Sequence, residues 1–464
     1  MKREISIGTV LLAAIVVAGA ALRLYGLSVN SLWLDEATTL QISSLPFWGI
    51  AFADPVHPPL FYWIEHVAVH LFGTTEFGLR LVPALCGILA IPVFYLLGKE
   101  TDGPATGIIA AGLIAVSPFH IIYSQEARMY SLVLLLVSLA FLFYLRAMNG
   151  NTLREWALFG LFSALSVWTH YYTFLIIGVI FLHAITIASR RQKFRGLVLS
   201  LLFFTVGTVP LAISVLALIR TRSSIGSVFG VQGWAMLDTT LQHLAGYGFV
   251  TVLICLVAYV LGTVAYSIEN KEKGLLLMMG FAIPLAVSVL LSEHITMVPR
   301  YLIWLLPFFL IPIAYAGRII YEGMPKVMGF RPVATAMLVL LLCTPLAPLT
   351  TGTVNTDWRG FSDTLTSLTE PGDQVIVMPG YTAKVLGYYY DNETDGTILS
   401  VANNLTDLQA VALEQKDCWI VTSVHLQQTD DNGAAYEYLE NTTKIIDGDP
   451  LSDVVLYHER AMIP

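Results

Sequence analysis

Long apolar runs recur along most of this chain, and they limit its fold more than any other feature of the sequence. The hydrocarbon core of a bilayer is about 30 Å thick, so a helix that crosses it needs about 20 mostly apolar residues. Only 12% of the 464 residues are charged, whereas soluble domains carry about 25%. We therefore expect an all-α polytopic membrane protein.

About eleven segments are apolar enough to be transmembrane helices. They are expected at residues 5–25, 78–98, 105–122, 129–147, 156–170, 172–189, 196–219, 239–267, 274–291, 300–318 and 332–349. The first segment is longer than the apolar part of a typical signal peptide and lacks an Ala-x-Ala cleavage site, so we expect it to be retained.

The charges between these segments predict which side of the membrane each loop occupies. Short loops rich in Lys and Arg stay in the cytoplasm, and alternate loops here, such as RRQKFR at 190–195, fit that rule. The prediction is a multi-pass cell-membrane protein with a cytoplasmic N-terminus. Residues 26–77 and the chain after 350 would then lie outside the cytoplasm.

The stretch 57–73 is apolar enough to cross, but it carries Glu65, His66 and His70. If it crossed, every later loop would change sides and RRQKFR would face outward. We therefore expect it to lie on the outer surface as an amphipathic interfacial helix.

The tail has a different composition and predicts a small α/β domain at 350–464, after a membrane domain at 1–349. Short buried strands are expected at 373–378 and 418–424, with helices at 359–369 and 405–415. The net charge of −8 does not favour a nucleic-acid partner. The four cysteines lie far apart and form no Cys-x-x-Cys pair, so neither a zinc knuckle nor a disulfide framework is indicated.

Two adjacent acids, Asp35 and Glu36, follow Trp33 in the first outer loop. A carboxylate can take the proton from an acceptor hydroxyl during group transfer, so Asp35 and Glu36 are candidate catalytic residues. The alternative is structural, because acidic residues are also favoured in the first turn of a helix.

A second group of residues has the chemistry of a metal site. Asp54 and His57 lie in DPVHPP, while His170 and His294 lie at two later outer boundaries. Asp54 and His57 could bind a divalent metal together, and His170 could be a ligand, a base or an interfacial residue. The alternative for Asp54 and His57 is a proline-rich turn with a solvated histidine.

Arginines at the outer boundary predict a phosphate site. Arg128 stands beside the candidate substrate-binding residues Gln125, Glu126 and Tyr130. Guanidinium groups bind phosphate through paired hydrogen bonds, although an arginine at this depth could instead reach lipid headgroups.

A further pair, Arg300 and Tyr301, could serve the same phosphate. Trp33 and Tyr171 could stack on a sugar ring or belong to an ordinary interfacial aromatic belt.

Three motifs together resemble a known superfamily. They are WLDEATTLQIS (33–43), HPPLFYWIEHVAVHLFGTTEFGLRLVPALCG (57–87) and SPFHIIYSQEARMYSL (117–132). The combination is similar to the protein O-mannosyltransferase and aminoarabinose-transferase superfamily of membrane glycosyltransferases, which have the GT-C fold. The resemblance covers about residues 1–190 well and continues more loosely to VPRYLIWLLP and the start of the tail.

The resemblance implies a polyprenyl- or dolichyl-phosphate sugar as donor and a glycan, protein or lipid as acceptor on the outer face. Transfer in such enzymes typically inverts the anomeric centre. The presumed base of the family maps onto Asp35, and a donor-phosphate arginine maps onto Arg128, with Arg300 as a second candidate. Val56 stands where some members have a metal-binding acid, which leaves metal dependence open. Any metal site of the family's kind would need Asp54, His57, His170 or His294.

Three other interpretations remain. A lipid-linked sugar flippase or transporter would be expected to carry mid-membrane charges and inverted repeats, and we find few such charges and no repeat. An oligosaccharyltransferase shares the fold, but its WWDYG signature is absent from the sequence. A non-catalytic relative is the third.

Overall fold

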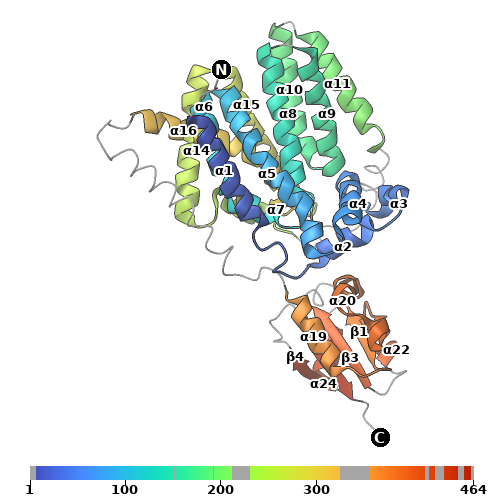
Figure 1. The fold of residues 1–464 in the computed structure, drawn as a ribbon. Helices are drawn as coiled ribbons and strands as arrows, with labels where there is room; N and C mark the ends of the chain where they lie inside the picture. The colour runs from blue at the N-terminus through green and yellow to red at the C-terminus, as the bar shows by residue number, and fades with distance from the viewer. Residues whose placement is uncertain are drawn as a thin grey trace. The chain divides into compact units, whose positions relative to one another are not determined.

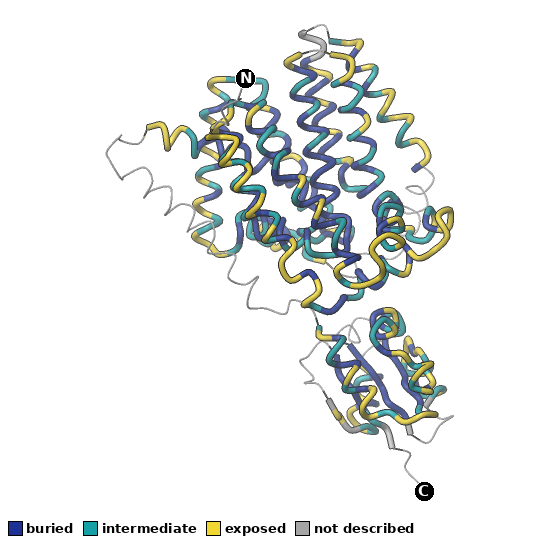
Figure 2. Tube along the Cα trace, viewed as in Figure 1, coloured by how far each residue is buried: buried dark blue, intermediate teal, exposed yellow. Residues whose placement is uncertain are grey.

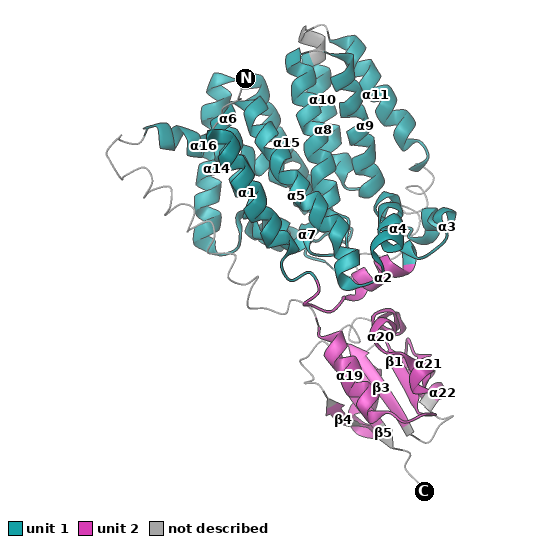
Figure 3. Cartoon of the chain, in the orientation of Figure 1, with its two compact units in different colours: residues 1–27, 42–351 teal, residues 28–41, 352–464 magenta. Residues whose placement is uncertain are grey.

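The computed structural model describes residues 7–150, 152–191, 193–211, 230–323, 356–412, 417–423, 433–447 and 454–460. The chain forms two compact units (Figure 3). Unit 1 comprises residues 1–27 and 42–351, and unit 2 comprises residues 28–41 and 352–464.

Unit 1 is built from helices, as the apolar runs predict (Figure 1). They are α1 (Ile7–Leu24), α3 (Phe47–Ala53), α4 (Leu60–Phe72), α5 (Glu76–Thr101), α6 (Pro104–Ala115), α7 (Pro118–Ser124), α8 (Tyr130–Gly150), α9 (Leu153–Thr169), α10 (Thr173–Arg191), α11 (Phe194–Thr208), α13 (Gly233–Ala245), α14 (Phe249–Glu269), α15 (Lys271–Leu291), η1 (Pro299–Leu305) and α16 (Leu306–Gly323).

Within the described residues, six helices are long and apolar enough to cross a membrane, or seven if the bent pair α6–α7 forms one span. The predicted helix at 332–349 and the end of the one at 196–219 lie outside the described ranges.

The predicted helix at 105–122 is broken, and α6 and α7 meet at an angle of 59°. Pro118 begins the second piece and has no N–H to offer the carbonyl of Ile114, four residues earlier. Arg23, buried at the end of α1, donates from Nη2 to that carbonyl at 2.9 Å and from Nη1 to Ala115 O at 3.0 Å. The arginine therefore satisfies backbone groups that the proline frees inside an apolar environment.

The predicted single helix at 239–267 is wrong, because the structure has two helices there, α13 and α14. Gly246, Tyr247 and Gly248 separate them, with φ values of 99°, 64° and 88°. Left-handed backbone ends a right-handed helix, and glycine adopts it without steric penalty.

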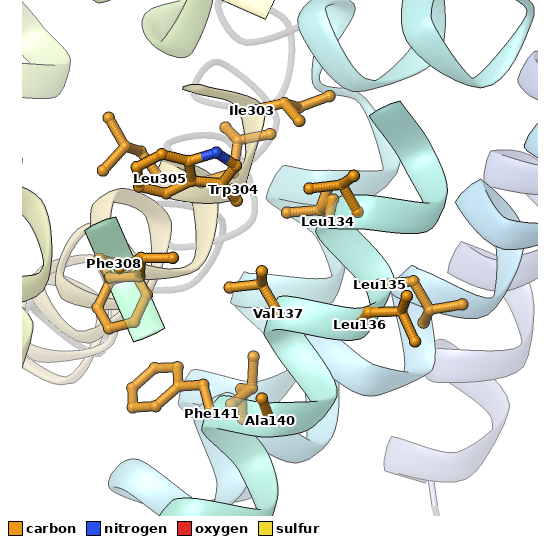
Figure 4. Close-up of a cluster of buried hydrophobic side chains, with 14 of the residues drawn as sticks. Leu134, Leu135, Leu136, Val137, Ala140, Phe141, Ile303, Trp304, Leu305 and Phe308 are labelled. Carbon is orange, nitrogen blue, oxygen red and sulfur yellow. The ribbon is translucent and has the colours of Figure 1, made fainter. Parts of the chain in front are cut away.

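The core of unit 1 surrounds α8, most of whose residues are buried along the whole helix (Figure 2). Leu134, Val137 and Phe141 line its side toward η1 and α16 (Figure 4). The rings of Phe141 and Phe308 stack with centroids 4.6 Å apart. This packing holds α8, which begins at Tyr130, two residues after Arg128.

Helix α4 occupies most of the stretch 57–73 and has 13 residues. At 1.5 Å per residue it is about 20 Å long, too short for a hydrocarbon core of about 30 Å. Its placement on the outer surface of the membrane stays a prediction.

Unit 2 contains a five-stranded sheet in the order β2-β1-β3-β5-β4. The strands are β1 (Gln374–Met378), β2 (Ile398–Val401), β3 (Asp417–Ser423), β4 (Lys444–Asp447) and β5 (Val454–Arg460). β1 pairs in parallel with β2 and β3, and β5 is antiparallel to both β3 and β4. The two strands predicted from the sequence are β1 and β3, the central parallel pair.

Helices cover both faces of this sheet. They are α19 (Trp358–Leu368), α20 (Ala383–Tyr389), α21 (Asn392–Asp395), α22 (Leu405–Ala412) and α24 (Ala434–Thr442), with a short 3-10 turn, η3 (Gly380–Thr382). Val375 and Val377 pack under α19 and α20, whereas Ile376 and Met378 pack toward α22 and α24. The alternation follows from the two-residue period of a strand.

Candidate functional site

The first-loop acids lie on α2 (Leu34–Ser43), whose residues up to Gln41 belong to unit 2. Both are in its first turn, as the structural alternative predicts. Glu36 is fully buried, and its carboxylate accepts the N–H of Trp33 at 3.3 Å, as in a capping box. Asp35 is half-buried, which makes it the more accessible acid.

A cluster of four polar side chains lies in unit 1, where the loop before α4 meets the loop before α8. His57 Nδ1 is 2.8 Å from Asp54 Oδ2, and Tyr62 donates its hydroxyl to the same oxygen at 2.8 Å. Arg128, only 3% exposed, donates from Nη1 to Tyr62 Oη at 3.4 Å. Its Nη2 lies 3.4 Å from His57 Nε2. We call Asp54, His57, Tyr62 and Arg128 the arginine cluster.

Asp54 is the anion that balances this cluster. Burial alone would raise the pKa of its carboxyl group. The hydrogen bond and positive charge of His57, together with the Tyr62 hydroxyl and the Val56 N–H, instead hold the pKa below its usual range. Asp54 therefore stays ionised at neutral pH, and it orients His57 so that Nε2 faces Arg128.

Replacing Asp54 by asparagine should destabilise unit 1 by about 1.5–3 kcal/mol, since hydrogen bonds to a charged group are lost. The folded pKa lies below the unfolded value of about 3.9, so the ionised group stabilises the fold above that pH. Its contribution disappears only as the pH falls through the folded pKa. Thermal melting in detergent should show a constant difference between wild type and D54N from pH 8 to pH 5.

The matched control is D238N, which removes an exposed carboxylate from α13. It should melt like the wild type throughout. A D54N difference that vanishes already at pH 6 would contradict the assignment of Asp54 as a stabilising anion.

Aromatic and histidine rings extend the cluster. The His170 ring is 6.1 Å from that of His57 and 5.1 Å from that of Tyr301. Tyr301 also lies 6.4 Å from Tyr130 and 5.5 Å from Tyr172. Rings from three segments of the chain thus lie next to the arginine cluster, an arrangement suited to a sugar face.

The junction of α4 and α9 also has an apolar side. The Trp63 and Trp168 rings stack 5.7 Å apart, and their N–H groups donate to Phe47 O and Gly207 O. They line a hollow of about 620 Å³ whose other walls are Leu60, Leu161, Ala164, Leu165, Leu202, Phe203, Val206 and Gly207. Helix α4 therefore contributes Tyr62 to the arginine cluster and Trp63 to the hollow.

The remaining predicted residues take different places. Gln125 Nε2 donates to Leu22 O at 3.1 Å and Tyr25 O at 2.8 Å, so this amide fastens the end of α1. Glu126 and Arg300 both act electrostatically on Tyr123. Tyr171 is half-buried at the turn before α10, beside His170.

The four candidate metal ligands do not assemble. His294 is exposed in the loop after α15, whereas Asp54 and His57 are bonded to each other. Across the described ranges, no group of three or more His, Cys, Asp or Glu side chains is placed to hold a metal ion. As the structure places them, these residues do not fit a divalent-metal site.

Sequence comparisons match only part of the chain. Residues 56–215 match the family described as dolichyl-phosphate-mannose-protein mannosyltransferase. "Putative mannosyltransferase YkcB" of Bacillus subtilis is 26% identical over 148 residues, which are 30% of this chain and 20% of that protein. A protein of Aquifex aeolicus is 28% identical over 113 residues, 22% of each chain. The matched segments span about a fifth of these relatives.

Structural comparisons cover nearly the whole chain. The apo structure of ArnT from Cupriavidus metallidurans matches with a TM-score of 0.64 and 14% identity over 98% of both chains. The chain has the GT-C fold. The GT-C oligosaccharyltransferase AglB from Archaeoglobus fulgidus matches with a TM-score of 0.58 and 13% identity, over 98% of this chain and 75% of that one. The GT-C fold expected from the three motifs is thereby confirmed.

Tyr62 is the member of the arginine cluster that the sequence did not reveal. It lies within the apolar run LFYW, where a tyrosine is an ordinary interfacial residue. The sequence offered one weak signal. Tyr62 follows His57 by five residues, a separation that lets a loop and one helical turn bring both side chains to the Asp54 carboxylate.

Proposed function

We propose that this GT-C protein transfers a sugar from a polyprenyl- or dolichyl-phosphate donor to an acceptor hydroxyl at the extracytoplasmic face of the membrane. The arginine cluster carries the proposal. A buried guanidinium beside His57 and Tyr62 is suited to a lipid-linked phosphate. In two structures with this fold, ArnT is bound to undecaprenyl phosphate and AglB is in complex with a dolichol-phosphate.

The donor is amphipathic, and helix α4 contributes Tyr62 to the polar arginine cluster and Trp63 to the apolar hollow. Arg128 and His57 would hold the phosphate, with Arg300 and Tyr301 as further contacts. The isoprenoid chain would lie along the apolar hollow that Trp63 and Trp168 line. Rings such as Tyr130 would contact the sugar.

The reaction is a single displacement. The acceptor oxygen forms a bond to the anomeric carbon while the bond between that carbon and the phosphate oxygen breaks. The acceptor proton passes to the Asp35 carboxylate, and the leaving lipid phosphate keeps the electron pair. The negative charge of the leaving phosphate grows by one unit, and the arginine cluster stabilises this added charge.

Transfer assays in nanodiscs test this function. Purified protein is given a panel of radiolabelled polyprenyl-phosphate sugars with short and long isoprenoid chains, together with membrane glycolipid, glycan and peptide acceptors. We expect one sugar to be transferred, and the long-chain donor to have the lower KM.

The flippase interpretation gives a different result in the same preparation. The lipid-linked sugar would then cross a liposome bilayer without being consumed. That outcome, or no consumption of any donor, would overturn the proposed function.

A further inference from the structure

The acid-bearing segment and the C-terminal domain fold as one unit. Residues 28–41 cluster with residues 352–464 (Figure 3), although Ser31 and Asp357 are 326 residues apart in the chain. Because residues 28–41 are bonded to the C-terminal domain, that domain determines their position. Two groups of hydrogen bonds and one packing contact make the connection.

Ser31 forms the first group at the N-terminus of α19. Its Oγ donates to Asp357 Oδ1 at 3.1 Å and accepts the N–H of Arg359 at 3.1 Å. Asp357 Oδ1 also accepts the N–H of Gly360 and so caps α19. The Asp357 carboxylate thus caps the N-terminus of α19 and also binds Ser31, which lies three residues before the start of α2.

Tyr389, at the end of α20, forms the second group. Its hydroxyl accepts the N–H of Leu32 at 2.7 Å, and Leu32 is 0% exposed. The guanidinium of Arg359 lies 5.8 Å from the Tyr389 ring centroid and donates to Ser28 O at 3.4 Å. A buried backbone N–H without this acceptor would be unsatisfied, because water does not reach it.

The helix α2 itself completes the connection. Ala37 belongs to the apolar core that includes Trp358, Phe361 and Leu365 of α19. Asp35 lies between these contacts in the chain. The hydrogen bonds of Ser31 and Leu32 come before it, and the core contact of Ala37 comes after it.

We propose that the C-terminal domain is the positioning element for Asp35, and that Tyr389, Asp357 and Ser31 are its positioning residues. This inference rests on the proposed function. A general base must lie within hydrogen-bond reach of the proton that it takes, and a displacement of about 1 Å can lower the rate about 10²-fold. The domain thus contributes to the chemical step through α2.

The test uses Y389F in the full-length protein, which removes one hydroxyl group and keeps the ring. We expect kcat to fall about 10- to 100-fold, with the KM for the donor and the binding of polyprenyl phosphate unchanged. The double variant S31A/Y389F should fall further. Y436F is the matched control, since Tyr436 is a tyrosine on α24 of the same domain, and its kcat should equal that of wild type.

Hydrogen–deuterium exchange gives a readout that needs no turnover. Amides of residues 31–41 should exchange faster in Y389F than in Y436F, while α4 should stay unchanged. Unaltered exchange at 31–41, or a wild-type kcat in Y389F, would overturn the positioning role. A wild type that transfers no sugar, with faster exchange in Y389F, would instead overturn the proposed function and leave the connection between α2 and the domain in place.

Discussion

Replacing Asp35 by asparagine should reduce sugar transfer about 10²- to 10⁴-fold, which is the usual contribution of a general base. Asparagine has nearly the same size and keeps its place in the first turn of α2, but it cannot take a proton. The acceptor hydroxyl must then attack without deprotonation. The measurement is kcat with the donor found in the transfer assay, together with the dissociation constant of polyprenyl phosphate.

Donor binding should be retained in D35N, so the loss should appear in kcat rather than in KM. The matched control is D363N, which removes an exposed carboxylate from α19 in the same unit and should transfer normally. Full transfer by D35N would move the base to another group, and His57 would be the next candidate. It would leave the assignment of Arg128 to the donor phosphate untouched.

Replacing Arg128 by glutamine should lower kcat/KM for the donor about 10²- to 10³-fold, as when one stabilising donor is removed from an oxyanion site. The phosphate of the donor carries about one negative charge and gains another as the bond to the sugar breaks. The attraction to Arg128 therefore grows toward the transition state, so kcat should fall more than KM rises. Steady-state kinetics with a titrated donor measure both quantities.

R128K separates charge from geometry. Lysine keeps the charge but cannot contact Tyr62, His57 and a phosphate oxygen with one planar group, so we expect an intermediate rate. R154Q removes an exposed arginine at the start of α9 and serves as the control. Melting curves must show that each variant is folded, because Arg128 is buried. A folded R128Q with the rate of R154Q would contradict the phosphate role.

Much of the fold could be predicted because its strongest signals are local. Apolar runs such as that of α8 need no knowledge of the rest of the chain, and β1 and β3 are short apolar strands that helices cover on both faces. The break between α13 and α14 was missed because AGYGF continues an apolar run. The glycines on both sides of Tyr247 were the available signal.

The candidate site was only partly accessible to sequence reasoning. Asp54, His57, Arg128 and His170 could be named by residue type, and the structure brings them together in unit 1. Their grouping with Tyr62, and the packing of residues 28–41 on the C-terminal domain, depend on contacts between distant parts of the chain. No local pattern encodes such pairings.

Unit 2 combines residues 28–41 with residues 352–464, so it cannot fold until the second segment has been synthesised. A ribosome adds about 5–20 residues per second, so the 326 residues between Ser31 and Asp357 take about 15–65 s to make. During that interval α2 is present without the core it packs against. Under the positioning role inferred for the C-terminal domain, a nascent or prematurely terminated chain would have a membrane domain without a placed base. Completion of translation would then act as the activating step.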